Sequence, residues 1–104
     1  MTTISVIRED LKDIKYYYSR KALFDKAVAV TNGNEIVNKV NTYNELMKSA
    51  SPRIYDLYYS LYVINHTQES YSDELGCTPE YVQRLNKKLL KFLLLKINEM
   101  EGIE

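Results

Sequence analysis

The feature that most constrains the fold of this chain is the tetrapeptide Gly76-Cys77-Thr78-Pro79, which separates two segments with helical patterning. Glycine adopts the left-handed conformation that commonly ends a helix at little cost. Threonine is a favourable N-cap, and proline is favoured at the first helical position because its missing N–H would have no partner there. We therefore expect one helix to end just before Gly76, a sharp turn, and a new helix that begins at Pro79.

The segments on both sides of this turn have the pattern of a helix-turn-helix. A short helix is predicted over Gln68–Leu75, with Thr67 as its cap. A long helix is predicted from Pro79 to about Met100, and its apolar stripe contains Val82, Leu85, Leu89 and Phe92. The opposite face carries Glu80, Gln83, Arg84 and Lys87. A helix of this kind can pack on its scaffold with one face while the other face enters a DNA major groove.

Two helices are expected at the start of the chain. The first covers residues 5–30, where apolar residues recur near the helical period. Residues 31–34, which include Gly33, carry a turn signal, and Asn34 is expected to cap the second helix. Because the turn is short, these helices are expected to form an antiparallel hairpin.

A third helix is predicted over residues 52–65, where Ser51 is followed by a proline suited to the first helical turn. The sequence therefore predicts an all-α protein. An N-terminal helical hairpin (residues 1–50) is expected to pack on a helix-turn-helix region (residues 51–104) with a long final helix, as one compact unit.

The chain has 104 residues, a net charge of zero and a single cysteine. One cysteine forms no internal disulfide and no Cys-rich metal site, which is typical of a reducing compartment. The sequence contains no apolar run of the roughly 18 residues that a membrane span needs. Its N-terminal residues lack the apolar core of a signal peptide. We therefore expect a cytoplasmic location and no membrane partner.

The residue types that enzymes use are not grouped in this sequence. It lacks a glycine-rich phosphate loop, carboxylates expected to share a cleft, and a serine–histidine arrangement. His66 has no second ligand at metal spacing, and Cys77 is expected to pack in the turn. We therefore expect a protein that is not an enzyme and that binds no cofactor and no metal.

The charge is unevenly distributed along the chain. Residues 79–98 contain one acid, Glu80, and five basic residues: Arg84, Lys87, Lys88, Lys91 and Lys96. A basic helix on a neutral body is compatible with DNA contact, but a monomer would bind weakly because each phosphate contact adds a modest, salt-dependent term. A homodimer that pairs two half-sites is expected to supply the remaining affinity.

Residues 51–93, SPRIYDLYYSLYVINHTQESYSDELGCTPEYVQRLNKKLLKFL, resemble the fourth region of bacterial sigma factors, a helix-turn-helix that binds promoter DNA. With REDLKDIKYYYSRKALFD near its start, the whole chain is similar to the phage-encoded late-transcription activators of the ArpU and RinA type. The resemblance implies a sequence-specific DNA-binding regulator that activates phage or mobile-element genes. It implies duplex DNA as a partner, with RNA polymerase or another regulator as a further one.

The resemblance also implies which residues contact DNA. The implied base contacts are Thr78, Pro79, Glu80, Gln83, Arg84 and Lys87. The implied phosphate contacts are Thr67, Gln68, Lys88 and Lys91. Arg84 and Gln83 are the best candidates for direct recognition, because arginine can pair with guanine and glutamine with adenine. Two alternatives stay open: these can be ordinary solvated helix residues, and Thr67 can be a helix cap alone.

Two positions depart from the family pattern. Ser72 stands where a small apolar residue is preferred at the contact between the two helices, and Tyr71 occupies a normally aliphatic position. With the zero net charge, these departures favour a second hypothesis in which the helix-turn-helix is retained only as a scaffold. The protein would then be an all-helical module that binds another regulator or RNA polymerase without contacting DNA.

Apolar residues outside the expected core stripes predict a protein interface. Tyr16, Tyr17 and Tyr18 cannot all face one core, because successive helical residues point about 100° apart. Three leucines of the last helix lie beside or opposite its stripe and must meet the N-terminal hairpin or another subunit. The residues predicted at an interface are Tyr16, Tyr17, Leu90, Leu94 and Leu95.

Overall fold

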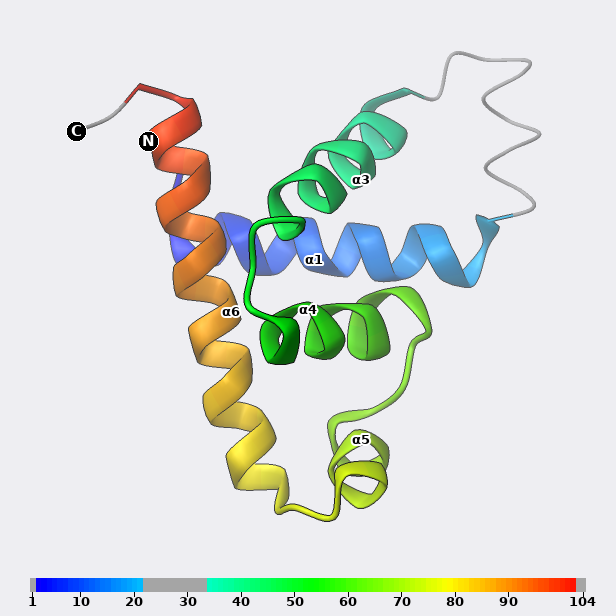
Figure 1. Cartoon of the computed structure of the whole chain (residues 1–104). Helices are drawn as coiled ribbons and strands as arrows, with labels where there is room; N and C mark the ends of the chain where they lie inside the picture. Colours follow the sequence, from blue (N-terminus) through cyan, green and yellow to red (C-terminus); the bar gives the residue numbers. More distant parts are fainter. Residues whose placement is uncertain (1, 22–33, 103–104) are drawn as a thin grey trace.

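Figure 1 shows the computed structural model, which describes residues 2–21 and 34–102. These residues contain helices and no strand, so the predicted all-α class is confirmed. The elements in chain order are α1 (Ile4–Ser19), α3 (Asn34–Met47), α4 (Pro52–Tyr58), the π-helical turn η1 (Tyr59–Val63), α5 (Gln68–Leu75) and α6 (Pro79–Met100).

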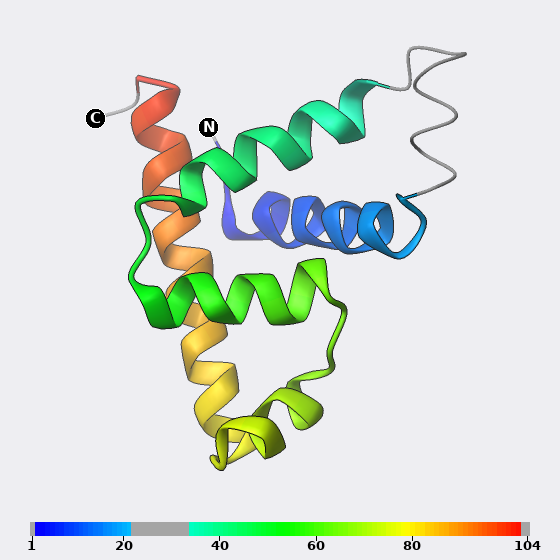
Figure 2. The same cartoon turned by 45° about the vertical axis from the view of Figure 1, so that its right-hand side comes forward.

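The long helix α6 runs along one side of the molecule, and the other helices are arranged against it (Figures 1 and 2). α3, α1 and α4 lie one below the other, each with one end near α6, and all three contact it. α1 runs away from α6 and α3 runs back toward it, so the two helices are antiparallel. α5 lies at the far end of the molecule, beside the start of α6. The helix-turn-helix therefore forms one end of the structure.

A single apolar core joins the N-terminal and C-terminal helices. α1 contacts η1, α3 and α6, so it lies between the two halves of the chain. Each described element contributes to the core, whose members are Ile7, Leu11, Ile14, Tyr17, Val40, Tyr43, Met47, Leu57, Tyr58, Leu61, Tyr71, Val82, Leu85, Leu89, Leu90, Leu93 and Ile97. Because burial of apolar surface is the main favourable contribution to folding, we expect the two halves to unfold together.

The turn between α5 and α6 has the predicted geometry. The two helices begin and end at the predicted residues. Gly76 has a left-handed backbone (φ 69°). The side chain of Thr67 accepts a hydrogen bond from the Ser70 N–H, and the side chain of Thr78 accepts one from the Tyr81 N–H. Both threonines therefore satisfy a backbone donor that the start of a helix leaves unpaired.

The first predicted helix is interrupted at Arg20. α1 ends at Ser19 instead of residue 30, because Arg20 leaves the helical backbone region at φ −131° and its N–H pairs with the Tyr17 carbonyl. The rest of that predicted helix, from residue 22, and most of the turn at 31–34 lie outside the described residues. α3 begins at Asn34, so the residue predicted to cap this helix is instead its first helical residue.

The third predicted helix contains a change of pitch. α4 continues into η1, where the Ile64 N–H bonds to the Tyr59 carbonyl five residues back at 2.9 Å. The helical segment ends at Val63 instead of residue 65, and Asn65 takes a left-handed backbone with φ 69°. Asparagine tolerates this conformation because its short polar side chain can hydrogen-bond locally.

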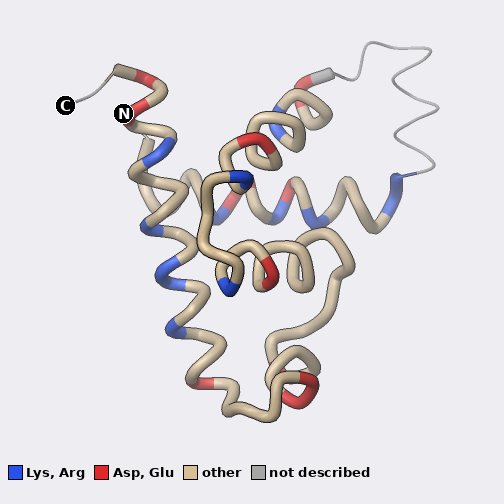
Figure 3. The backbone as a smooth tube through the Cα atoms, viewed as in Figure 1, with Lys and Arg blue, Asp and Glu red and all other residues tan. Residues whose placement is uncertain are grey.

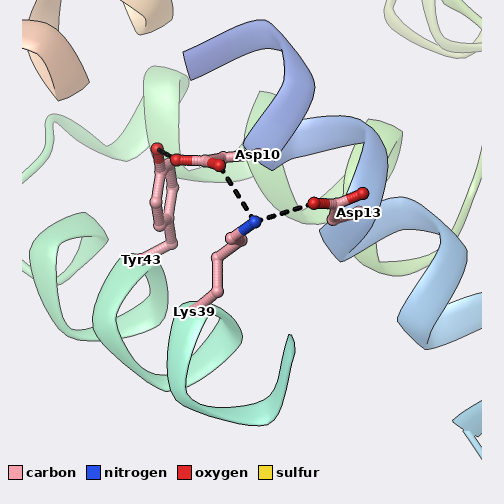
Figure 4. A network of polar contacts seen from close by, with 4 residues as sticks. All are labelled: Asp10, Asp13, Lys39 and Tyr43. Carbon is pink, nitrogen blue, oxygen red and sulfur yellow. Dashed lines mark hydrogen bonds and ion pairs between the residues drawn. The ribbon is translucent and has the colours of Figure 1, made fainter. Parts of the chain in front are cut away.

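A polar network joins α1 to α3 (Figure 4). The Lys39 ammonium lies 3.0 Å from Oδ1 of Asp10 and 2.7 Å from Oδ2 of Asp13. The Tyr43 hydroxyl donates a 2.6 Å hydrogen bond to Oδ2 of Asp10. The hydrogen bond with Asp13 is the largest cause that raises the pKa of Lys39, while burial opposes the shift. The network sets how α3 lies along α1.

A second chain of hydrogen bonds joins three helices. The Tyr58 hydroxyl on α4 donates to Oδ1 of Asn44 on α3 at 2.7 Å. Nδ2 of Asn44 in turn donates to the Tyr18 hydroxyl on α1 at 2.9 Å. Burial is the main cause that raises the pKa of Tyr58. The buried hydroxyl is thus satisfied, as a polar group in a core must be.

Candidate nucleic-acid interface

The first half of α6 is accessible along its polar face. Together with α5 it projects beyond the stacked helices in Figures 1 and 2. All six residues predicted to contact bases are exposed: Thr78, Pro79, Glu80, Gln83, Arg84 and Lys87. The apolar stripe of the same helix is buried, with Val82 and Leu89 fully enclosed. The predicted division of α6 into a packed face and a free face is therefore confirmed.

Basic residues follow α6 along its length (Figure 3). Lys88 and Lys91, two of the predicted phosphate contacts, are exposed. None of Arg84, Lys87, Lys88 and Lys91 has an ion pair with a carboxylate among residues 2–21 and 34–102. Their charges are therefore available to an anionic partner.

Arg84 is positioned by an aromatic neighbour on its own helix. Its guanidinium lies 5.8 Å from the ring centroid of Tyr81, which is partly exposed. A cation above an aromatic ring is held weakly at an exposed site, by about 0.5–1 kcal/mol. This contact orients the guanidinium without using its hydrogen-bond donors, so they stay free for a ligand.

The start of α5 holds the other two predicted phosphate contacts. Thr67 is exposed and Gln68 is half-buried. The Thr67 side chain caps the helix, as the alternative interpretation expected. A phosphate contact at these residues stays a prediction.

The two departures from the family pattern are accommodated by the packing. Tyr71 is 1% exposed, and its hydroxyl donates a 2.5 Å hydrogen bond to Oδ2 of Asp56 on α4. Ser72 is fully buried, and its hydroxyl donates to the Glu69 carbonyl at 2.7 Å. Both side chains satisfy their polar atoms, so the contact between α5 and α6 is kept. The departures therefore do not argue against an intact helix-turn-helix.

A cleft of about 380 Å³ lies between α1 and the first half of α6. Its lining residues are Arg8, Leu11, Lys12, Lys15, Tyr62, Gln68, Gln83, Asn86, Lys87 and Leu90. Three of them, Gln68, Gln83 and Lys87, were predicted from sequence to contact DNA. The basic residues that α1 adds were missed, although their spacing of four and three residues places them on one side of a helix. Only the tertiary structure shows that this side faces α6.

One wall of this cleft is fixed by a hydrogen bond between η1 and α6. The Tyr62 hydroxyl donates to Oδ1 of Asn86 at 2.7 Å. Burial raises the pKa of Tyr62, against the opposing effects of the Asn86 hydrogen bond and the nearby Arg8 charge. Because Oδ1 of Asn86 accepts this bond, the amide nitrogen is left as the donor that can serve a ligand.

The predicted protein interface is corrected at two positions. Tyr17 is 7% exposed and Leu90 is 3% exposed, and both belong to the chain's own core, so neither can contact another protein. Leu90 was expected to meet either the hairpin or another subunit, and it meets the hairpin because α1 packs on α6. Leu94 is half-buried against the core, whereas Tyr16 and Leu95 are more than half exposed. For these three residues the interface stays a prediction.

Comparisons of the chain with known protein families, with curated proteins and with solved structures gave no match. Among the described residues, none of the helices is both long enough and apolar enough to span a bilayer.

Proposed function

We propose that this protein is a sequence-specific DNA-binding regulator of transcription that places the first half of α6 in the major groove. The observation that carries the proposal is the polar face of α6, which is exposed from Thr78 to Lys91 while the opposite face is buried. A recognition helix needs this division, because it must be held by its scaffold and still reach base edges. The resemblance of residues 51–93 to sigma region 4 supports promoter DNA as the target.

Arg84 and Gln83 are proposed to recognise bases. Arginine can donate two hydrogen bonds to O6 and N7 of guanine, and glutamine can pair with N6 and N7 of adenine. Each such pair contributes about 1–3 kcal/mol of discrimination, which corresponds to a preference of about 5- to 150-fold. Thr78, Pro79, Glu80 and Lys87 complete the proposed base-facing set, and Glu80 suits the amino group of cytosine.

The proposed phosphate contacts lie beside this set. Lys88 and Lys91 are exposed on α6, and Thr67 and Gln68 lie at the start of α5. These contacts position the helix on the duplex and carry no sequence information. Because the body of the protein is neutral, the local contacts must supply most of the salt-dependent affinity.

The test is a selection from a pool of random-sequence duplexes by the purified protein, followed by affinity measurements on the selected and a scrambled duplex. The unsubstituted protein is expected to enrich a common sequence. Arg84→Ala combined with Gln83→Ala is expected to reduce the preference for that sequence at least fivefold and to leave the thermal unfolding midpoint unchanged. Arg20→Ala combined with Asn38→Ala removes an arginine just after α1 and an amide on α3, both at exposed positions, and should leave the preference intact. Unchanged preference in the α6 variant would overturn base recognition by these residues.

A second candidate function is that of a protein-interaction module that binds RNA polymerase or another regulator. A depression of about 440 Å³ is lined by Lys48, Ala50, Pro52, Tyr55, Asp56 and Tyr59. Its two tyrosines are 45% and 44% exposed. Exposed tyrosines are enriched in protein interfaces because a rigid aromatic ring with a polar tip loses little entropy on binding.

This candidate is tested with purified RNA polymerase as the probe. Tyr55→Ala combined with Tyr59→Ala is expected to weaken the association, whereas Val6→Ala combined with Ile64→Ala, at exposed positions outside the depression, should not. Binding to polymerase together with no detectable duplex binding at low salt would favour this function over DNA recognition.

A further inference from the structure

The cleft between α1 and α6 concentrates positive charge beside the proposed recognition helix. Arg8, Lys12 and Lys15 line it from α1, and Lys87 lines it from α6. The neutral donors in its wall are the amides of Gln68, Gln83 and Asn86. A concave site with four cations and three amide groups focuses a positive potential and offers hydrogen-bond donors to an anion.

Two acidic residues of α1 and the basic residues that line the cleft lie on opposite sides of the helix. Asp10 and Asp13 lie on the flank that faces α3, where Lys39 binds both carboxylates (Figure 4). The basic residues lie on the opposite flank, which faces the cleft. Because the two acids are engaged by α3, they are not available to neutralise the cleft. A helix with mixed charges thus presents a basic surface to one side only.

The cations of the cleft have few acidic neighbours. Lys12 pairs with Glu9 at 3.3 Å, but both side chains are largely exposed, and such pairs are weak. Arg8, Lys15 and Lys87 have no carboxylate partner among the residues that the structure describes. Like charges gathered in this way repel one another, so an anion in the cleft would relieve the repulsion.

We infer that the cleft holds the sugar–phosphate backbone of the DNA strand that runs past α6, with Arg8 and Lys15 of α1 as phosphate contacts. The inference rests on the proposed function and extends its surface from the helix-turn-helix to the N-terminal helix. Lysine, arginine and amide side chains are the groups that proteins use on phosphate oxygens.

The duplex backbone is favoured over a free nucleotide by the position of the cleft. Gln83 and Lys87 line the cleft and also belong to the exposed face of α6 that is proposed to enter the groove. Arg84 and Lys88 do not line it, because successive residues point about 100° apart and these two lie on the other side of α6. A strand that borders the groove would therefore pass α1 on one side of the recognition helix.

The experiment measures affinity for the selected duplex at a series of salt concentrations. Each phosphate contact contributes about 0.9 to the slope of log affinity against log salt. Arg8→Gln combined with Lys15→Gln is expected to make this negative slope less steep by about 1.8. The preference for the selected over the scrambled duplex should stay unchanged. The matched control, Arg20→Gln combined with Lys48→Gln, removes one arginine and one lysine at exposed positions outside the cleft, and its slope should equal that of the unsubstituted protein.

The outcomes separate this inference from the proposed function. Equal slopes for the cleft variant and the control variant overturn the inference while the proposed function stands. Saturable binding of ATP alone that is lost in the cleft variant would assign the cleft to a small nucleotide and overturn it as well. If the unsubstituted protein binds no duplex at low salt, the proposed function falls and the inference falls with it. Should the double variant not fold, Arg8→Gln and Lys15→Gln are measured singly, each with an expected decrease of about 0.9 in the slope.

Discussion

The hydroxyl of Tyr71 on α5 donates a hydrogen bond of 2.5 Å to the carboxylate of Asp56 on α4. Tyr71→Phe is expected to lower the free energy of unfolding by about 1 kcal/mol, because the ring stays buried and the exposed Asp56 can be hydrated instead. Tyr59→Phe, at a side chain that is 44% exposed, is the control and should change the free energy little. Chemical denaturation measures both. An unchanged stability in the Tyr71 variant would contradict a role for this bond.

Alkaline pH is expected to destabilise the fold. Burial, and next the bond to Asp56, raise the pKa of Tyr71 from its ordinary value of 10.0 to about 12. Burial likewise raises the pKa of Tyr43 and of Tyr58. A tyrosine whose pKa is higher in the folded state stabilises that state below its unfolded pKa, so this stability is lost as the pH rises from about 10 through the folded pKa. Denaturation at increasing pH should show this loss of unfolding free energy. In the Tyr71→Phe variant the unfolding free energy should fall less steeply between pH 10 and 12.

The network between α1 and α3 is expected to contribute to stability. Lys39→Met removes the cation that Asp10 and Asp13 share, and we expect the free energy of unfolding to fall by about 1 kcal/mol, since the groups are only partly buried. Lys48→Met is the control, because its pair with Glu45 is exposed and such pairs contribute little. Thermal or chemical unfolding compares the variants. A loss no larger than that of the control would show that the network is not stabilising.

The turn of the helix-turn-helix is expected to depend on the left-handed backbone of Gly76. Gly76→Ala should cost about 1–2 kcal/mol, because a Cβ is strained at this φ although no atom lies within 4 Å of its position. Gly102→Ala is a matched control with φ 75° and equally open space. Gly102 follows α6 and, unlike Gly76, does not join two helices among the described residues, so a shift of its backbone displaces no packed helix. Equal losses of unfolding free energy in the two variants would refute this explanation.

If the homodimer expected from the sequence forms, we predict that Leu95 lies in its interface. This side chain is 59% exposed on α6, next to the half-buried Leu94. Leu95→Asp should increase the dimer dissociation constant by at least tenfold, since a buried carboxylate in an apolar contact is unfavourable. Met100→Asp, at a similarly exposed apolar side chain of the same helix, should have little effect. Sedimentation equilibrium gives both constants, and a monomer at every concentration would rule the dimer out.

Local signals in the sequence were sufficient for the helix-turn-helix. The bounds of α5 and α6 could be predicted because Thr67, Gly76 and Thr78 each act on backbone groups a few residues away. The end of α1 could not be predicted in this way, because apolar residues continue to recur near the helical period beyond Ser19. The π-helical turn was missed because Tyr59–Val63 covers too few residues for its wider turn to show as a different apolar period.

The candidate site was predictable where one helix forms it and not where two helices meet. The exposed face of α6 follows from the spacing of its own apolar residues, so Gln83, Arg84 and Lys87 could be identified without a structure. Leu90 and Tyr17 were assigned to a protein interface because the sequence does not show which neighbour covers them. They are buried because α1 packs on α6, α3 and η1.

By itself, the sequence determined the helical class, the turn at Gly76 and the polar face of α6, because caps, left-handed residues and helical period act over one or two turns of chain. The tertiary structure alone decided that Arg8, Lys12 and Lys15 face Lys87 across a cleft. Residues 8 and 87 are far apart in the chain, and they lie together only because burial of Ile7, Leu11 and Ile14 against the shared core orients α1 toward α6.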